Sequence, residues 1–153
     1  MHQSDSRDPD MTELRCGSWA ELGAAARAIR EAVFVHEQHI PAAMVCDDAD
    51  DGAVHAVAFS RLGQALASGR LLSLGGGVAK IGRMATVRAG RGAGIGRQVL
   101  MALMQAARAR GDTEVLLHAQ ASAVAFYLRA GYVCDGPPFI EADIPHQAMR
   151  MRL

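Results

Sequence analysis

The segment from Arg91 to Gly96 has the composition best suited to holding a ligand. It reads Arg91-Gly92-Ala93-Gly94-Ile95-Gly96. Residues without a Cβ let several backbone N–H groups point into one concavity, and such a concavity at the start of a helix attracts anions. The segment therefore predicts a binding site for a pyrophosphate, although a tight turn with a purely structural role would have the same composition.

Two common phosphate-binding classes do not fit the surrounding residues. No Gly-Lys-Ser/Thr follows the glycines, so a P-loop would lack both its lysine and its magnesium ligand. A dinucleotide-binding fingerprint follows the first strand of a βαβ unit, with an acidic residue about 20 positions further on. Here strand-like runs precede the glycines, and Glu114, near that distance, begins a strand instead.

The hydrophobic pattern places the glycine-rich segment between a strand and a helix. Strands are expected at 14–16, 53–59, 65–74, 80–88, 113–118, 132–134 and 148–153. Helices are expected after the capping residue Ser18 toward Val35, from Ile95 to Gly111, and at 122–130. The stretch 36–52, which includes an acidic cluster, is expected to be a long loop with at most a turn of helix. This order of elements predicts a mixed α/β sheet.

Length, composition and charge limit the class of protein. The chain has 153 residues, half of them hydrophobic, which predicts one compact domain, while the polar and acidic residues 1–11 predict a disordered tail. Sixteen basic and sixteen acidic residues leave no overall positive field for binding nucleic acid or a membrane. No signal peptide is recognisable and no segment approaches the roughly 18 apolar residues of a membrane span, so we expect a soluble, cytoplasmic protein.

The cysteines and the acidic cluster do not predict a metal site. Cys16, Cys46 and Cys134 are widely separated and form no C-x-x-C pair, which favours a reducing compartment over a disulfide framework or a zinc site. The acidic run lacks the alternation and the final glutamate of an EF-hand. We therefore expect no metal cofactor.

Two motifs together resemble those of the GNAT (Gcn5-related N-acetyltransferase) superfamily. Arg91-x-x-Gly94-x-Gly96 is similar to its R/Q-x-x-G-x-G/A signature, and Phe126-Tyr127-x-x-x-Gly131-Tyr132 downstream is similar to its F-Y-x-x-x-G-F element. The segments VFVHEQ, KIGRMATV, LHAQ and FIEADIPHQAM resemble the small bacterial ElaA/YjcF-like branch. The resemblance implies one GNAT domain over 12–153, with a central mixed sheet of six to seven strands flanked by about four helices.

The resemblance also implies acetyl-coenzyme A (acetyl-CoA) as cosubstrate. In this superfamily the strand before the glycine loop splays from its parallel neighbour, and the pantetheine arm lies in the gap. The residues implied to contact acetyl-CoA are Met84, Ala85 and Thr86 on the strand, Arg91, Gly92, Ala93, Gly94, Ile95 and Gly96 in the loop, and Gln120, Phe126 and Tyr127 beside them. Many members have an asparagine near the position of Gln120, so the pantetheine contact there differs.

Acyl transfer to an amine requires a proton acceptor, because a protonated amine has no lone pair. Tyr127 lies where many family members have the tyrosine that protonates the leaving thiolate. Its alternative role is packing beside the cofactor. The candidates for the base are Glu37, His55, Glu141 and His146, and the residues alone do not choose between them. Glu141 and His146 are implied to lie in a late loop over the acceptor.

The acceptor is expected to be a primary amine of a small molecule or a peptide. Residues that could bind it are Arg30, Phe34, His55 and Arg70, the arginines through a carboxylate of the acceptor. The alternative for both arginines is an ion pair with the acidic cluster, which comprises Asp47, Asp48, Asp50 and Asp51. Exposed strands near the C-terminus could pair in a homodimer.

Two other functions remain compatible with the same motifs. A non-catalytic GNAT module would bind an acyl-CoA as a sensor or partner domain without turnover. An acyl-homoserine lactone synthase would share a related fold, but the full loop signature and the F-Y-x-x-x-G motif favour the N-acetyltransferase.

Overall fold

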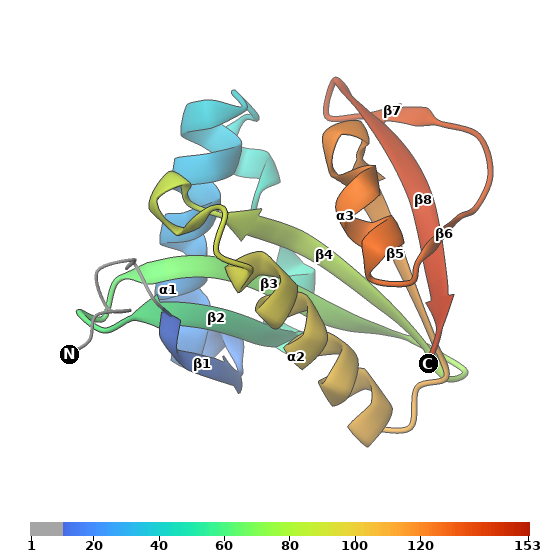
Figure 1. Ribbon diagram of the computed structural model, residues 1–153, viewed down its shortest axis with the longest axis horizontal. Coiled ribbons are helices and arrows are strands. Elements are labelled where there is room, and N and C mark those ends of the chain that lie inside the picture. Colours follow the sequence, from blue (N-terminus) through green and yellow to red (C-terminus); the bar gives the residue numbers. More distant parts are fainter. Residues whose placement is uncertain (1–10) are drawn as a thin grey trace.

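The computed structural model of the protein describes residues 11–153, which form one mixed sheet with helices on both faces (Figure 1). Its strands are β1 (Met11–Gly17), β2 (Val54–Ser60), β3 (Ala65–Gly75), β4 (Val78–Thr86), β5 (Glu114–Gln120), β6 (Val133–Cys134), β7 (Phe139–Glu141) and β8 (Ile144–Arg152). The order across the sheet is β1-β2-β3-β4-β5-β8-β6, with β7 also pairing to β8. The predicted tail lies outside the described residues, except that Met11 begins β1.

The predicted mixed sheet is confirmed, with eight strands in place of six or seven. The difference arises near the C-terminus, where β8 begins at Ile144 and folds back on β7 through Ala142 and Asp143. Both turn residues have positive φ, 53° and 61°, which L-residues other than asparagine and aspartate rarely adopt. A strand prediction based on hydrophobic alternation has no signal for such a turn.

The helices begin and end largely where the capping signals predict. Ser18 caps α1 (Trp19–Arg30) in a capping box with Glu21, as predicted, and α1 continues as the π-helix η2 (Glu31–Glu37). The other α-helices are α2 (Ile95–Ala109) and the short α3 (Val124–Arg129). Single turns of 3-10 helix are η3 (Ala42–Met44), η4 (Asp48–Gly52), η5 (Arg88–Gly90) and η6 (Ala121–Ala123).

Two hydrophobic cores form on opposite faces of the sheet, because alternate residues of a strand point to opposite sides. On β2, Val57 packs with α1 in one core, whereas Ala56 and Ala58 pack with α2 in the other. Tyr127 of α3 belongs to the same core as α2. Helix α1 therefore covers one face, and α2 and α3 cover the other (Figure 1).

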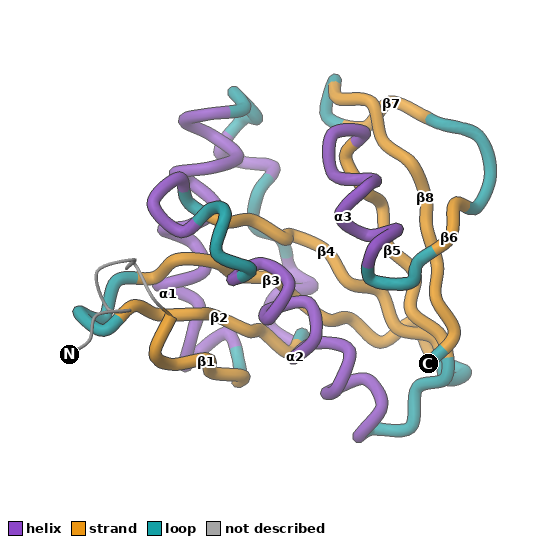
Figure 2. The backbone as a smooth tube through the Cα atoms, viewed as in Figure 1, coloured by secondary structure: helices purple, strands orange, loops and turns teal. Residues whose placement is uncertain are grey.

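The parallel strands β4 and β5 separate halfway along their length. They pair from Val78 opposite Glu114 to Ile81 opposite Leu117, and the pairing ends there. Figure 2 shows the two strands meeting at one end of the sheet and diverging toward the other. The edge of β4 from Gly82 to Thr86 that faces β5 is therefore free of sheet pairing.

A β-bulge accompanies this separation. Ser68 and Arg70 of β3 lie opposite Ala85 and Gly82 of β4, so β4 contains an extra residue in the interval. Arg83 in the bulge has a φ of 55°. The bulge changes the direction of the side chains on β4 at the point where the sheet opens.

Candidate active site

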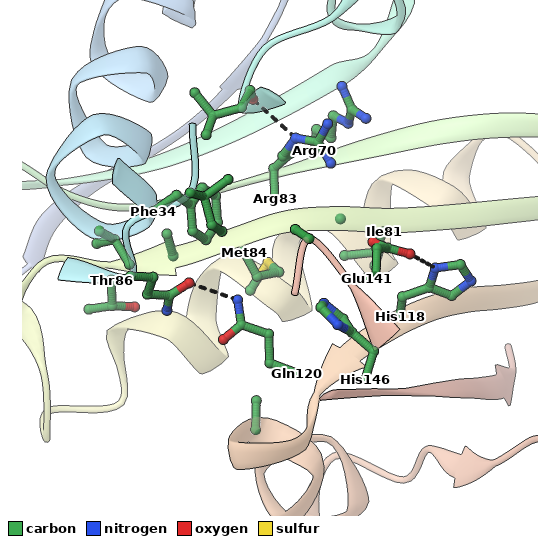
Figure 3. A pocket seen from close by; sticks show the side chains of 18 of the residues that line it. Phe34, Arg70, Ile81, Arg83, Met84, Thr86, His118, Gln120, Glu141 and His146 are labelled. Carbon is green, nitrogen blue, oxygen red and sulfur yellow. Dashed lines mark hydrogen bonds and ion pairs between the residues drawn. The ribbon is translucent and has the colours of Figure 1, made fainter. Parts of the chain in front are cut away.

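A cavity of about 500 Å³ passes through the opening between β4 and β5. Its wall includes Phe34 of η2 on the α1 face of the sheet and Tyr127 of α3 on the opposite face. Strand β4 contributes every residue from Lys80 to Thr86, and the β7–β8 hairpin contributes Glu141, Ala142 and His146 (Figure 3). Two molecules approaching from opposite faces of the sheet could therefore meet at β4.

The glycine loop leads from β4 to α2, as predicted. Gly92 and Gly94 have φ of 85° and 78°, and Gly94 is the N-cap of α2. Among the backbone hydrogen bonds in residues 11–153, none is donated by the N–H groups of 92–96. The start of α2 thus presents unpaired N–H groups, the feature that binds phosphate oxygens at helix N-termini.

A second cavity of about 620 Å³ lies against these N–H groups. It is lined by Thr86, Gly90, Arg91, Gly92, Gly94, Ile95, Gly96, Arg97, Phe126 and Arg129. Arg97 and Arg129, on which the sequence analysis placed no role, add two cations with no ion pair among the described residues. A Cβ on Gly96 would lie 3.0 Å from Thr86 Oγ1, so glycine is the residue that keeps this corner open.

The side chain of Arg91 is engaged within the protein. Its Nε donates to the Thr86 carbonyl oxygen at 3.0 Å, and its guanidinium pairs with Glu37 Oε1 at 2.6 Å. This ion pair connects the glycine loop to η2 at the edge of the main cavity. Glu37, a predicted base candidate, is consequently paired with a cation in the protein without a ligand.

Tyr127 lines the main cavity from the α3 side and is 6% exposed. Its ring packs edge-on against Phe126 at 4.9 Å and against Tyr132 at 5.8 Å between centroids. Burial raises the pKa of the Tyr127 phenol. The hydroxyl therefore keeps its proton at neutral pH.

An imidazole–carboxylate pair lies on the other side of the cavity. His118 Nδ1 lies 3.0 Å from Glu141 Oε1, and both residues line the cavity (Figure 3). A carboxylate only accepts hydrogen bonds, so Nδ1 is the donor in this pair and Nε2 is the nitrogen that can accept a proton. His118 is the first residue of β5 after the last pair with β4.

His146 is adjacent to this pair but differently bonded. Its Nδ1 donates to the Ile144 carbonyl oxygen at 2.7 Å, and its ring stacks on Phe139, which contacts His118 edge-on. The predicted candidates Glu141 and His146 are therefore brought together in one cluster. His118 was missed by the sequence analysis, and the LHAQ segment containing it was the available signal.

Gln120 and Gln38 meet where the strands have opened. Gln120 Nε2 donates to Gln38 Oε1 at 2.8 Å, which joins the end of β5 to the end of η2 (Figure 3). Both residues line the main cavity. Gln120, predicted to contact the cofactor, is thus in the cavity, with its amide bonded to a protein group.

A buried ion-pair network joins α1, η4 and β3. Arg30 makes two hydrogen bonds of 2.9 Å to Asp50, and Arg70 bonds Asp50 at 3.0 Å and Asp47 at 2.6 Å. His55 Nε2 donates to the Asp50 carbonyl oxygen at 2.9 Å, and burial lowers the His55 pKa. Arg30, Asp50 and His55 are each at most 1% exposed.

The four predicted acceptor-binding residues fall into two groups, one that lines the main cavity and one that does not. Phe34 and Arg70 line the main cavity, whereas Arg30 and His55 lie outside its wall. The arginines form the ion pairs that were the alternative interpretation, because a guanidinium without a carboxylate partner is too costly to bury here. The structure therefore gives Arg30 and His55 a structural position, away from any ligand in the cavity.

Within residues 11–153, no group of three or more histidine, cysteine, aspartate or glutamate side chains is arranged to hold a metal ion. None of the helices described has the length and apolar character required to span a membrane.

Comparison with known proteins assigns this arrangement to a family. Residues 9–153 match the model of the acetyltransferase (GNAT) domain. The chain is 34% identical over 122 residues to YjcF of Bacillus subtilis, described as an uncharacterised N-acetyltransferase, across 79% of this chain and 86% of YjcF. An acyl-CoA N-acyltransferase from Pseudomonas aeruginosa is 37% identical with a TM-score of 0.77, covering 90% of this chain and 97% of that one.

The crystal structure of Escherichia coli ElaA is also similar to this chain. The sequence identity is 28% and the TM-score is 0.80, over 92% of this chain and 99% of ElaA. The protein is an acyltransferase of the GNAT class. Within that class it belongs to the branch that contains YjcF and ElaA, as its motifs indicated.

Proposed function

We propose that the protein transfers an acetyl group from acetyl-CoA to a primary amine of a small molecule or peptide. The observation that carries this proposal is the juxtaposition of a row of unpaired N–H groups at 92–96 with a cavity that crosses the sheet beside the unpaired edge of β4. Bound acetyl-CoA would supply the acyl thioester.

The residues around the glycine loop fit a coenzyme A. The N–H groups of 92–96 would hold the pyrophosphate, and Arg97 and Arg129 would attract further phosphate charge. Met84, Ala85 and Thr86 would offer main-chain groups to the pantetheine arm along the open edge of β4. Backbone donors suit this role because they are fixed before negative charge develops on the acyl oxygen.

Proton transfers would be divided between the two sides of the cavity. Tyr127, protonated and buried on the α3 side, would donate a proton to the leaving thiolate. His118 Nε2, with Glu141 holding the Nδ1 proton, would accept the proton of the amine directly or through water. His146 would shape the acceptor side, because its Nδ1 proton is already bonded to the Ile144 carbonyl.

The direct test is calorimetric titration with acetyl-CoA of the protein and of two variants. Gly96→Asp places a carboxylate beside the unpaired N–H groups, where it repels phosphate but favours the helix N-terminus. The added Cβ meets only the end of the Thr86 side chain, which can rotate away, so we expect this variant to stay folded and to lose acetyl-CoA binding. Gln105→Asp makes the same charge change on an exposed position of α2 and should bind normally. Undiminished affinity of Gly96→Asp would refute the assignment of the loop.

Turnover separates the enzyme from the two alternatives. Release of free thiol with an amine panel supports N-acetyl transfer, whereas tight binding without turnover supports a sensor module. A lactone product would instead support the acyl-homoserine lactone synthase alternative.

A further inference from the structure

A strip of β4 inside the main cavity carries two cations on either side of a glycine. Lys80, Gly82 and Arg83 all line the cavity. Ile81 is 1% exposed in the core beneath α2, so Lys80 and Gly82 point to the opposite face, the face of α1. Two residues along a strand place their Cα atoms about 7 Å apart. The strip therefore spans the length of a small ligand.

Lys80 has no hydrogen bond or ion pair through its side chain among the described residues. It is half-buried, and its neighbours on the same face include Leu72 opposite on β3. Among residues 11–153, no carboxylate lies within ion-pair distance of this ammonium group. A ligand with a negative charge would gain from meeting it there.

Arg83 lines the cavity at the bulge, and its guanidinium is bonded to residues 44–47. Its Nε donates to the Val45 carbonyl oxygen at 3.0 Å, and one terminal nitrogen pairs with Asp47 Oδ2 at 3.2 Å. The other terminal nitrogen has no partner among the described residues. Arg83 adopts a positive φ of 55° in the bulge, a backbone conformation that is strained for an L-residue. Strained backbone of this kind occurs often at functional sites.

Gly82 leaves the space between these cations open. A Cβ built on Gly82 would have nothing within 4 Å, and Gly82 is absent from the residues with positive φ. A side chain would therefore fit there without backbone strain. The space that it would fill is an open part of the cavity. This is room for a ligand group between Lys80 and Arg83.

The carboxylates behind the strip are fewer than the arginines that pair with them. In the network, Arg30, Arg70 and Arg83 face only two carboxylates, those of Asp47 and Asp50. Of the carboxylates lining the cavity, Glu37 is paired with Arg91 and Glu141 is bonded to His118. The strip thus has an uncompensated positive charge. For an amine bound in the cavity, the nearest carboxylate would be that of Glu141, which is bonded to His118.

We propose that the acceptor is an amine that also carries a carboxylate, as an amino acid does, and that Lys80 and Arg83 hold this carboxylate over Gly82. This inference rests on the proposed function and specifies its substrate class. The parallel register places His118 on the strand next to Gly82, about 5 Å away in a regular sheet and further here as the strands open. The amine would then face His118 and Glu141 while its carboxylate lies on β4.

The same charges disfavour polyamines and aminoglycosides. A second ammonium on the acceptor would meet Lys80 and Arg83 without a free carboxylate between them. The size of the cavity, about 500 Å³ with the pantetheine arm still to be held, favours a small acceptor over a folded peptide.

Binding of product analogues tests the proposal without requiring turnover. Amide chemical shifts of the ¹⁵N-labelled protein with saturating CoA would be followed during titration with N-acetylglycine and, separately, with N-acetylglycinamide. We expect N-acetylglycine to shift the amide signals of residues 80–86, and N-acetylglycinamide to bind at least about tenfold more weakly, the effect of losing one favourable charge interaction. Lys80→Met should remove this preference and Lys80→Arg should retain most of it.

The outcomes separate this inference from the proposed function. If CoA binds but both analogues bind equally, or neither shifts residues 80–86, the carboxylate subsite is wrong while the cofactor assignment stands. If CoA does not bind, the proposed function fails and the inference fails with it. In turnover, amino acids should exceed their amides in kcat/KM by a similar factor, and faster reaction of polyamines would overturn the inference alone.

Discussion

Asp50 joins Arg30 of α1 to Arg70 of β3, and its replacement by asparagine tests how far the fold depends on this junction. Four donors converge on its carboxylate: two from Arg30, one from Arg70 and the backbone N–H of Asp47. Asparagine has the same shape, but it places an NH₂ group where two of these donors now find an oxygen. It also leaves three arginines with Asp47 as their only carboxylate in the network.

The expected loss of stability is large because the site is buried. Asp50 is 1% exposed, and removing one partner of a buried ion pair costs about 3–5 kcal/mol. For a chain of this length about 2–4 °C of Tm is lost per kcal/mol, which corresponds to a decrease of roughly 6–20 °C. Urea and thermal unfolding followed by circular dichroism would measure both quantities.

The matched control is Asp51→Asn, an identical change at the adjacent exposed residue. It should alter the free energy of unfolding by less than about 0.5 kcal/mol. A loss below about 1 kcal/mol for Asp50→Asn would show that the network does not stabilise the fold. It would also remove the reason for regarding Arg30 as structural.

Two further predictions concern Tyr127 and acid pH. Tyr127→Phe keeps the ring packing against Phe126 and Tyr132 but removes the acidic proton, so kcat should fall about a hundredfold with little change in acetyl-CoA affinity; steady-state kinetics showing an unchanged kcat would exclude Tyr127 as the acid. Burial opposes ionisation of Asp50, but hydrogen bonds from Arg30 and from the Asp47 N–H outweigh it and hold its pKa far below the usual range. The hydrogen bond from Arg70 likewise lowers the pKa of Asp47. Because the folded pKa values are depressed, their stabilisation is complete above the unfolded pKa of about 3.9 and is lost as the pH falls below about 4. Urea unfolding across this range should show a steeper loss for the wild type than for Asp50→Asn, and parallel slopes would contradict the linkage.

Local signals in the sequence located the glycine loop that we propose to hold the cofactor. The glycines at 92 and 94 require the positive φ that they adopt, and the pattern of strand, loop and helix placed them at the start of α2. The capping box at Ser18 and the glycine that ends α3 were likewise predictable. These features depend on backbone preferences within a few residues, so they can be read without knowing the fold.

The proposed acceptor side of the cavity depends on contacts between distant parts of the chain. His118 and Glu141 come together only because β8 pairs with β5 and turns back into β7 through two residues of positive φ. For Arg30 the sequence left two alternatives, a ligand carboxylate and an ion pair with the acidic cluster, and only the folded chain shows that Asp50 is its partner. Arg83 reaches the cavity through a bulge that only the pairing of β3 with β4 defines. Which charges are paired and which are left free for a ligand depends on burial, and burial is a property of the tertiary structure.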